Sequence, residues 1–404
     1  MRFTIEHHRI QNLLLWLLVI SGAIKPFLSY YQIKPDITLL ILIGIITDVV
    51  FILLSGIRIT VEKVKVLFIF LIICFVILSY ISLIYSPSIN YGREKAAFIL
   101  IPIIGFLYPC VMKKIDLKLL FKVIIYIIIP ISLWFIVFKF LLYNDGGFLN
   151  QFINRQSFLE YRQDYLNLGY LLGILVLLAN EYSKKNVLTI AIGCFLMLGL
   201  GSRGALLFAG LSIIVVNFKQ LAARLHNFKF KKRFLRQLFA YGLPILAVLI
   251  VFWNKISSYS NYGISRFISL IKFGDDNSSM DRLLQYEFAL QKIVSPKGFI
   301  IGHGLGSWGI IYNGVDGKAY PHNVFLEVWF ELGLFGFAIL AFIFLTVFYL
   351  KRNNTIRLIA LFALLNALKS SSFAYDRNLF ILFGVLIFAS DKIMKPKNVK
   401  TTKY

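Results

Sequence analysis

The residue best suited to acid–base chemistry is His322, in the stretch PHNVFLEVWFELGLFG from Pro321 to Gly336. A Pro-His-Asn turn runs directly into an apolar segment, which places one imidazole where a loop meets a predicted membrane span. Imidazole titrates near neutral pH, and a histidine at such a junction can reach water from a partly dry site. The position therefore favours proton transfer. The alternative is a histidine that only marks the start of a helix at the membrane interface.

His303 is the other histidine that we expect on the same side of the membrane. It lies between Gly302 and Gly304, so capping a tight turn is the simpler interpretation of this residue.

Arginines form a second set of candidates. Arg203 follows Gly201-Ser202 in a short turn between two predicted spans, and Arg266 and Arg282 lie in a long loop, residues 254–322. Arginine suits a diphosphate because its planar guanidinium stays charged and donates hydrogen bonds in pairs. Each arginine taken singly could instead contact a lipid headgroup. Arg203 is the strongest candidate, because a charge in so short a turn is costly without a partner.

Two further charges, Asp48 and Lys369, fall inside apolar runs. Either a buried ion pair or a pore-lining role would explain each of them.

Several catalytic motifs are missing from the sequence. It has no DxD carboxylate pair, no Walker loop, no GxSxG elbow, and no outward-facing ligand cluster with metal spacing. We therefore expect neither a metal nor a cofactor. A site facing away from the cytoplasm lacks ATP and nucleotide sugars, so its substrate must arrive already activated, as a lipid diphosphate sugar does.

The elements that must position these residues are membrane helices. The chain has 404 residues, is 59% hydrophobic and carries a formal net charge of +24. Apolar runs recur throughout, which predicts an all-α polytopic membrane protein. Most basic residues lie in short loops between these runs, which indicates the positive-inside pattern and argues against nucleic-acid binding. We predict about twelve spans, at roughly twenty apolar residues each. They are 11–31, 37–57, 65–86, 95–112, 117–143, 166–181, 186–201, 203–218, 238–253, 323–350, 356–373 and 377–393.

Lysine and arginine concentrate in alternate loops, most strongly in residues 219–236, which predicts that both termini are cytoplasmic. The chain then divides into nine spans (1–253), a large outer loop (254–322), and three spans with a basic tail (323–404). Within the loop, DRLLQYEFALQKI (281–293) has the apolar spacing of an amphipathic helix lying on the bundle. GFIIGHGLGSW (298–308) predicts a tight glycine-rich turn near the membrane.

Four stretches together carry a family resemblance: GSRGALL (201–207), SRFISL with DRLLQYEFAL (265–290), GFIIGHGLGSW, and PHNVFLEVWFELGLFG. In this order they resemble the O-antigen ligase/polymerase superfamily, over roughly residues 165–345. The resemblance implies a GT-C-like glycosyltransferase of the bacterial inner membrane, with a large periplasmic loop. Such enzymes act without metal on undecaprenyl-diphosphate glycans. It also implies that His322 and Glu331 are catalytic, and that Arg203, Arg282 and, as a weaker match, Arg266 bind the diphosphate.

Three functions remain open at this point. The last motif looks more like a repeat-unit polymerase, for O-antigen or capsule, than a ligase that transfers glycan to lipid A-core. A transporter or flippase for the same lipids is the alternative from another class, although no repeat or pair of broken helices supports it. The expected partners are a lipid-linked oligosaccharide donor and acceptor and the membrane lipid. A protein that regulates chain length is a further possible partner.

Overall fold

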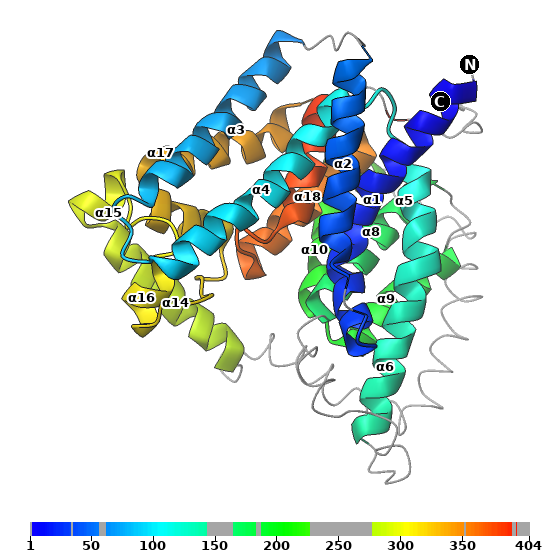
Figure 1. Cartoon of the computed structure of the whole chain (residues 1–404). Coiled ribbons are helices and arrows are strands. Elements are labelled where there is room, and N and C mark those ends of the chain that lie inside the picture. Colours follow the sequence, from blue (N-terminus) through cyan, green and yellow to red (C-terminus); the bar gives the residue numbers. More distant parts are fainter. Residues whose placement is uncertain are drawn as a thin grey trace.

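The computed structural model describes residues 2–33, 35–55, 62–143, 165–182, 187–226, 277–350, 353–389 and 393. Within these ranges the chain is helical, and its β structure is limited to one isolated bridge, between Ile115 and Ile393 (Figure 1). The helices are α1 (Arg2–Tyr30), α2 (Ile37–Leu54), α3 (Lys63–Ser82), α4 (Asn90–Val111), α5 (Leu117–Val123), η1 (Ile124–Ile128), α6 (Ile129–Tyr143), α8 (Tyr165–Tyr182), α9 (Val187–Leu200), α10 (Arg203–His226), α14 (Asn277–Ile293), α15 (Pro296–Ile300), α16 (Trp308–Asn313), α17 (Val324–Tyr349), α18 (Asn354–Ser370), α19 (Arg377–Gly384) and η5 (Val385–Ala389).

Six helical stretches of the described chain are long and apolar enough to cross a membrane: His7–Tyr30, Ile37–Leu54, Lys63–Ser82, Asn90–Val111, Leu117–Val137 and Val324–Tyr349. Four shorter apolar helices accompany them: Tyr165–Ala179, Val187–Leu200, Arg203–Val216 and Arg377–Ala389. Eleven of the predicted spans coincide with helical stretches, and the span predicted at 238–253 lies outside the described residues. The prediction of an all-helical protein is confirmed. Twelve crossings, the three-part division of the chain and the placement of its outer loop stay predictions.

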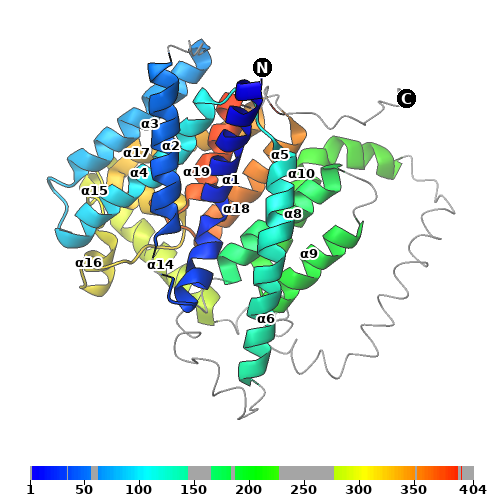
Figure 2. The ribbon, with the colours of Figure 1, turned by 45° about the vertical axis from the view of Figure 1, so that its right-hand side comes forward.

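The centre of the bundle is formed by α19 and the helices around it. Figure 2 shows α19 among α1, α4 and α18. Every residue from Leu379 to Ala389 is buried, and a Cβ on Gly384 would overlap the backbone of Phe106 in α4. This glycine allows the backbones of α4 and α19 to approach closely, as small residues do between packed membrane helices. This close contact fixes the position of α19 along its axis relative to α4, and with it the position of its first turn.

Side-chain caps fix the starts of the two helices nearest the candidate residues. Asn323 accepts hydrogen bonds from the backbone N–H groups of Phe325 (3.0 Å) and Leu326 (3.1 Å) at the start of α17. Asp376 accepts one from Leu379 (3.1 Å) at the start of α19. Such caps satisfy backbone donors that have no partner within the helix. The residue just before each cap therefore has a defined position.

The glycine-rich stretch 298–308 packs against a break in α17. Gly333 has φ 68°, so it interrupts the helix and leaves carbonyl groups of the preceding turn without helical donors. His303 N donates to Phe330 O at 2.8 Å, and Gly304 N donates to Glu331 O at 2.9 Å. A Cβ on Gly333 would overlap the carbonyl of Ile300, in addition to the cost of a positive φ. The tight turn that the sequence predicts is confirmed. Its backbone N–H groups also satisfy the carbonyl groups that the break in α17 at Gly333 leaves free.

The amphipathic helix predicted at 281–293 is also present, as part of α14, but only its C-terminal half packs as predicted. Ile293 is buried with Trp308, and Phe288 is partly buried against the same cluster. Leu283 and Leu284 are 59% and 52% exposed. The difference arises because the apolar partners, from α16 and α17, reach only the end of the helix.

Candidate functional site

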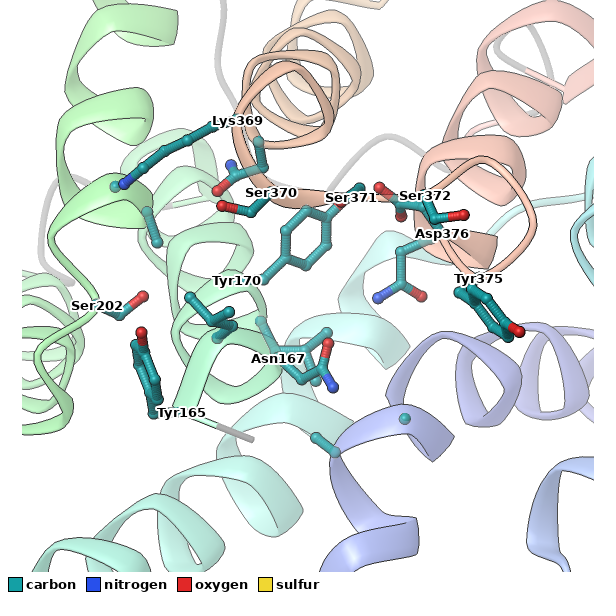
Figure 3. Close-up of a pocket in the computed structure, with 18 of the residues that line it drawn as sticks. Tyr165, Asn167, Tyr170, Ser202, Lys369, Ser370, Ser371, Ser372, Tyr375 and Asp376 are labelled. Atoms are coloured by element: carbon teal, nitrogen blue, oxygen red, sulfur yellow. The ribbon is translucent and has the colours of Figure 1, made fainter. Parts of the chain in front are cut away.

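A cavity of about 410 Å³ lies among α1, α8, α10 and the segment that joins α18 to α19 (Figure 3). Side chains of α14 and of the turn before α17 complete its wall. The lining residues are Val19, Gly22, Ala23, Tyr165, Leu166, Asn167, Tyr170, Leu171, Gly201, Ser202, Arg203, Gly204, Ala205, Arg282, Lys318, Tyr320, Asn366, Lys369, Ser370, Ser371, Ser372, Tyr375, Asp376, Arg377 and Asn378. This volume falls within the range of small-molecule binding sites, about 300–1,000 Å³.

The charge of the cavity is strongly asymmetric. Its basic lining residues are Arg203, Arg282, Lys318, Lys369 and Arg377. The acidic lining residue is Asp376, and its carboxylate caps α19. Convergent cations in a cavity attract anions, and arginine in particular pairs with phosphate oxygens. The cavity is therefore suited to an anionic ligand.

Arg203 enters the cavity from the first residue of α10. The preceding helix, α9, ends in a Schellman turn, in which Ser202 N donates to Met197 O and Gly201 N donates to Leu198 O, both at 2.9 Å. Gly201 has φ 76°, which glycine adopts without strain. Because α10 begins two residues later, its N-terminal end lies at the cavity wall together with Arg203. A helix N-terminus beside an arginine is a favourable place for a phosphate.

The two charges within apolar runs have different explanations. Lys369 lines the cavity, whereas the pore-lining role derived from the sequence stays a prediction. Asp48 lies instead in a buried polar cluster, where it accepts hydrogen bonds from Gln11 Nε2 and Tyr108 OH, each at 3.0 Å. His7 Nε2 is 3.5 Å from the same carboxylate. Asp48 therefore serves helix packing rather than the cavity.

His322 lies beside the cavity and is linked to it through Tyr320. The two rings are in edge contact, with centroids 4.8 Å apart, and Tyr320 lines the cavity. His322 has φ 55°, an unusual backbone conformation for a residue other than glycine. Its Nδ1 is buried and has no hydrogen-bond partner among the described residues. A strained backbone and an unsatisfied ring nitrogen in one residue are typical of a functional site.

The surroundings of His322 keep its ring neutral. Burial lowers the pKa of His322 to about 4, and the positive charge of Arg282 contributes to this shift. A neutral imidazole has one ring nitrogen that can accept a proton. The structure thus brings together three of the predicted residues: Arg203, Arg282 and, through Tyr320, His322.

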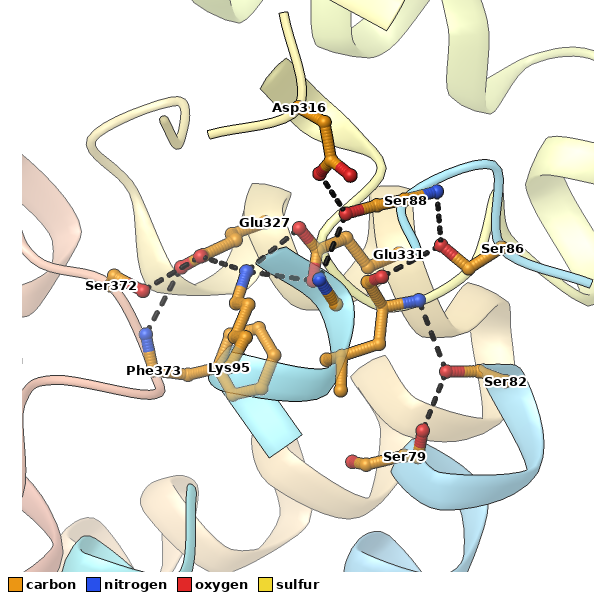
Figure 4. Close-up of polar contacts among 12 residues, drawn as sticks. Ser79, Ser82, Ser86, Ser88, Lys95, Asp316, Glu327, Glu331, Ser372 and Phe373 are labelled. Carbon is orange, nitrogen blue, oxygen red and sulfur yellow. Dashed lines mark hydrogen bonds and ion pairs between the residues drawn. The ribbon is translucent and has the colours of Figure 1, made fainter. Parts of the chain in front are cut away.

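Glu331 does not line the cavity and occupies a separate buried network (Figure 4). Lys95 Nζ lies 2.7 Å from both carboxylate oxygens of Glu331 and 2.6 Å from Glu327 Oε1, and all three side chains are 0% exposed. Glu327 also accepts hydrogen bonds from Ser372 Oγ (2.7 Å) and from the backbone N–H of Phe373 (3.0 Å). The network therefore ties α4 and α17 to the segment between α18 and α19, whose residues line the cavity.

Arg266 lies outside the described residues. Sequence reasoning did not select three basic residues that the structure places at or near the site: Lys95, Lys318 and Arg377. The available signal was that Lys95 and Arg377 stand at the first positions of predicted spans. Their partners lie far away in the sequence, so position alone did not distinguish them from ordinary interface cations. Within the described ranges, no group of three or more His, Cys, Asp or Glu residues is placed to hold a metal ion.

Comparison with known proteins gives one family match. Residues 188–341 match the family described as O-antigen ligase, and no curated protein matches the chain. The matched range begins in α9 and ends in α17, so it contains Arg203, Arg282 and His322. With several apolar helices of membrane-spanning character, this match supports a multi-pass membrane protein. The match to the O-antigen ligase family over residues 188–341 supports the O-antigen ligase/polymerase superfamily, which the sequence motifs resemble.

Proposed function

We propose that the protein is a repeat-unit polymerase of a bacterial surface polysaccharide. It transfers a glycan from undecaprenyl diphosphate to a hydroxyl group of another lipid-linked repeat unit. The observation that carries this proposal is the cationic cavity, in which Arg203 and Arg282 converge beside the Tyr320–His322 pair. The enzyme would reside in the inner membrane with both termini in the cytoplasm and the cavity facing the periplasm.

In the proposed reaction, His322 acts as the general base. Its neutral ring takes the proton of the acceptor hydroxyl while the oxygen attacks the anomeric carbon with inversion. The bond from that carbon to the diphosphate oxygen breaks, and its electron pair leaves with the lipid diphosphate. Arg203 and Arg282, with Arg266 as a further proposed contact, offset the charge that grows on this leaving group. Their contribution to the rate depends on binding the transition state more strongly than the bound substrate.

We assign Glu331 a positioning role rather than direct contact with substrate. Both of its carboxylate oxygens face Lys95, and its side chain is 0% exposed. Through Lys95 and Glu327 it holds the segment that begins with Ser371 and lines the cavity.

A ligase is the second candidate, because the matching family is described as O-antigen ligase. The same base and the same arginines would serve both reactions, since the donor and its leaving group are identical. The two enzymes differ only in the acceptor, which is a lipid-linked repeat unit for the polymerase and lipid A-core for the ligase.

Deletion of the gene separates the two candidates. For a polymerase, we expect lipopolysaccharide gels to show a single repeat unit on the core and no ladder, because ligation continues. Bare core with long glycan accumulating on undecaprenyl diphosphate would identify a ligase. An unchanged ladder would contradict both candidate functions for O-antigen. The chain length of the capsule polysaccharide in the deletion strain would then be measured in the same way.

The pH dependence of transfer follows from the electrostatics around His322. Because its pKa is about 4, the ring is in its base form at neutral pH, and activity should fall only as the pH drops through about 4. In Arg282→Gln, the loss of one nearby positive charge raises the pKa of His322, so the acidic limb of the pH–rate profile should move to higher pH. Arg203→Gln is the control, with a lower rate but an unmoved limb. A limb at the same pH in wild type and Arg282→Gln would contradict the assignment.

A further inference from the structure

We infer that Asp316 is a positioning residue for the proposed base, because it attaches the loop that carries His322 to the start of α4. This inference rests on the proposed function and adds to it a residue that acts on the reaction without touching substrate. The loop joins α16 to α17 and comprises residues 314–323, so His322 is its next-to-last residue. Asp316 does not line the cavity, so its effect on the reaction must pass through this loop.

The carboxylate of Asp316 caps α4 from a distant part of the chain. Ser88 Oγ donates to Asp316 Oδ1 at 2.6 Å (Figure 4). The backbone N–H groups of Asn90 and Tyr91 donate to the same carboxylate at 3.0 and 3.3 Å. The residue immediately before α4 is Ile89, whose side chain cannot accept a hydrogen bond. Two of the first backbone donors of α4 are therefore satisfied by the α16–α17 loop.

The charge of Asp316 strengthens this attachment. The hydrogen bond from the Ser88 hydroxyl lowers the pKa of Asp316 below its usual value, and those from backbone N–H groups act in the same direction against a smaller effect of burial. The carboxylate is therefore ionised at neutral pH. Hydrogen bonds to a charged acceptor are stronger than those between neutral groups, and a negative charge is favourable at a helix N-terminus.

Helix α4 holds the chain on both sides of His322. Asp316 lies six residues before His322, and Glu327 lies five residues after it. Glu327 Oε1 is 2.6 Å from Lys95 Nζ, about one and a half turns beyond the start of α4, and Figure 4 shows both contacts. Because one helix carries both contacts, it fixes the separation between the two ends of the segment that contains His322.

This restraint accounts for the backbone conformation of His322. Its φ of 55° is unfavourable for a residue with a side chain, and such a conformation persists where the surrounding structure fixes it. Without the attachment at Asp316, one end of the restrained segment is released. His322 can then relax to a negative φ, which moves its imidazole relative to the cavity-lining Tyr320.

The test begins with release of the loop. In Asp316→Ala, we expect kcat for transfer to fall about 10²-fold, the usual cost of misplacing a reacting group by about 1 Å. KM for the lipid-linked donor should not change, because Arg203 and Arg282 are untouched. Hydrogen–deuterium exchange of the purified protein without substrate should become faster in residues 317–323. Asp316→Asn keeps an oxygen that accepts from Ser88, so it should retain most of the wild-type kcat.

The double variant Asp316→Ala/Ser88→Asp restores the cap of α4 without restoring the attachment. Ile89 has helical dihedral angles (φ −84°, ψ −46°), so position 88 is placed as an N-cap, and an aspartate there can accept from the N–H groups of Asn90 and Tyr91. We expect the start of α4 to regain slow exchange while kcat stays as low as in Asp316→Ala.

Asp116→Ala is the matched control. Asp116 caps α5 within its own stretch of chain, by accepting from the N–H groups of Lys118 (2.9 Å) and Leu119 (3.2 Å), and it does not line the cavity. Loss of this cap should leave both kcat and the exchange of the α16–α17 loop at wild-type values.

Three results would overturn the inference: a wild-type kcat in Asp316→Ala, unchanged exchange of the loop in that variant, or recovery of kcat in the double variant. The last result would mean that Asp316 only stabilises α4. The exchange measurement needs no substrate, so it is independent of the proposed function, which fails instead if transfer survives the loss of the His322 imidazole.

Discussion

Replacing His322 with asparagine is expected to lower the rate of glycan transfer by about 10²- to 10⁴-fold, the usual contribution of a general base. Asparagine is the informative substitution because His322 has φ 55°, a conformation that asparagine tolerates better than most residues. The variant therefore removes the titrating ring and keeps the turn before α17. Binding of undecaprenyl diphosphate should be unchanged, because the arginines that bind it remain. Transfer is measured in vitro with purified protein and lipid-linked repeat units.

Two further variants complete this test. His322→Ala should lose transfer to the same extent, with an added loss of stability from alanine in a left-handed conformation. His303→Gln is the matched control, because His303 does not line the cavity and its ring packs on Phe330, with centroids 4.7 Å apart. Retained transfer in His322→Asn would show that the base lies elsewhere.

Replacing Lys95 with methionine is expected to destabilise the protein by about 3–5 kcal/mol, the usual cost of removing one partner from a buried ion pair. The expectation rests on Glu327 and Glu331, both 0% exposed, whose carboxylates would face each other without a cation. The free energy of unfolding in mild detergent measures the effect. Because Glu327 holds Ser372, the same variant should also weaken binding of undecaprenyl diphosphate in the cavity.

The triple variant Lys95→Met/Glu327→Gln/Glu331→Gln removes all three charges of the network. It separates the contribution of charge to stability from the contribution of side-chain packing. Removal of all three charges should restore much of the lost stability, because buried ion clusters contribute little compared with uncharged groups of similar volume. Glu331→Gln alone leaves one lysine and one carboxylate, so it should be close to wild type in stability and should retain transfer. A wild-type stability of Lys95→Met would contradict this account of the network, and loss of transfer in Glu331→Gln at full stability would assign Glu331 a direct catalytic role.

The cationic residues of the cavity lie partly inside and partly outside the range that matches the family. Arg203 and Arg282 lie inside the range that matches the O-antigen ligase family, whereas Lys369 and Arg377 lie beyond it. The cavity is thus built from the matched range together with α1, α8 and the final two helices.

The sequence by itself determined the helical class, the approximate helix positions and the most specific motif. Each of these is a local property. A run of apolar residues satisfies its backbone hydrogen bonds within a single helix, so its span can be predicted from neighbouring residues alone. The glycines of 298–308 and the Pro-His-Asn turn were likewise visible, because positive φ values and helix starts depend on a few adjacent residues.

Only the tertiary structure decided which charges meet. Lys95 pairs with Glu331 across 236 positions of sequence, and Arg377 reaches Thr38 across 339. No local pattern encodes such pairs, because they depend on how α4 packs against α17 and how α19 lies relative to α2. The same packing separated Asp48, held in a polar cluster, from Lys369, which lines the cavity. Both looked alike in the sequence, since each is one charge in an apolar run, and only the neighbouring helices give them different roles.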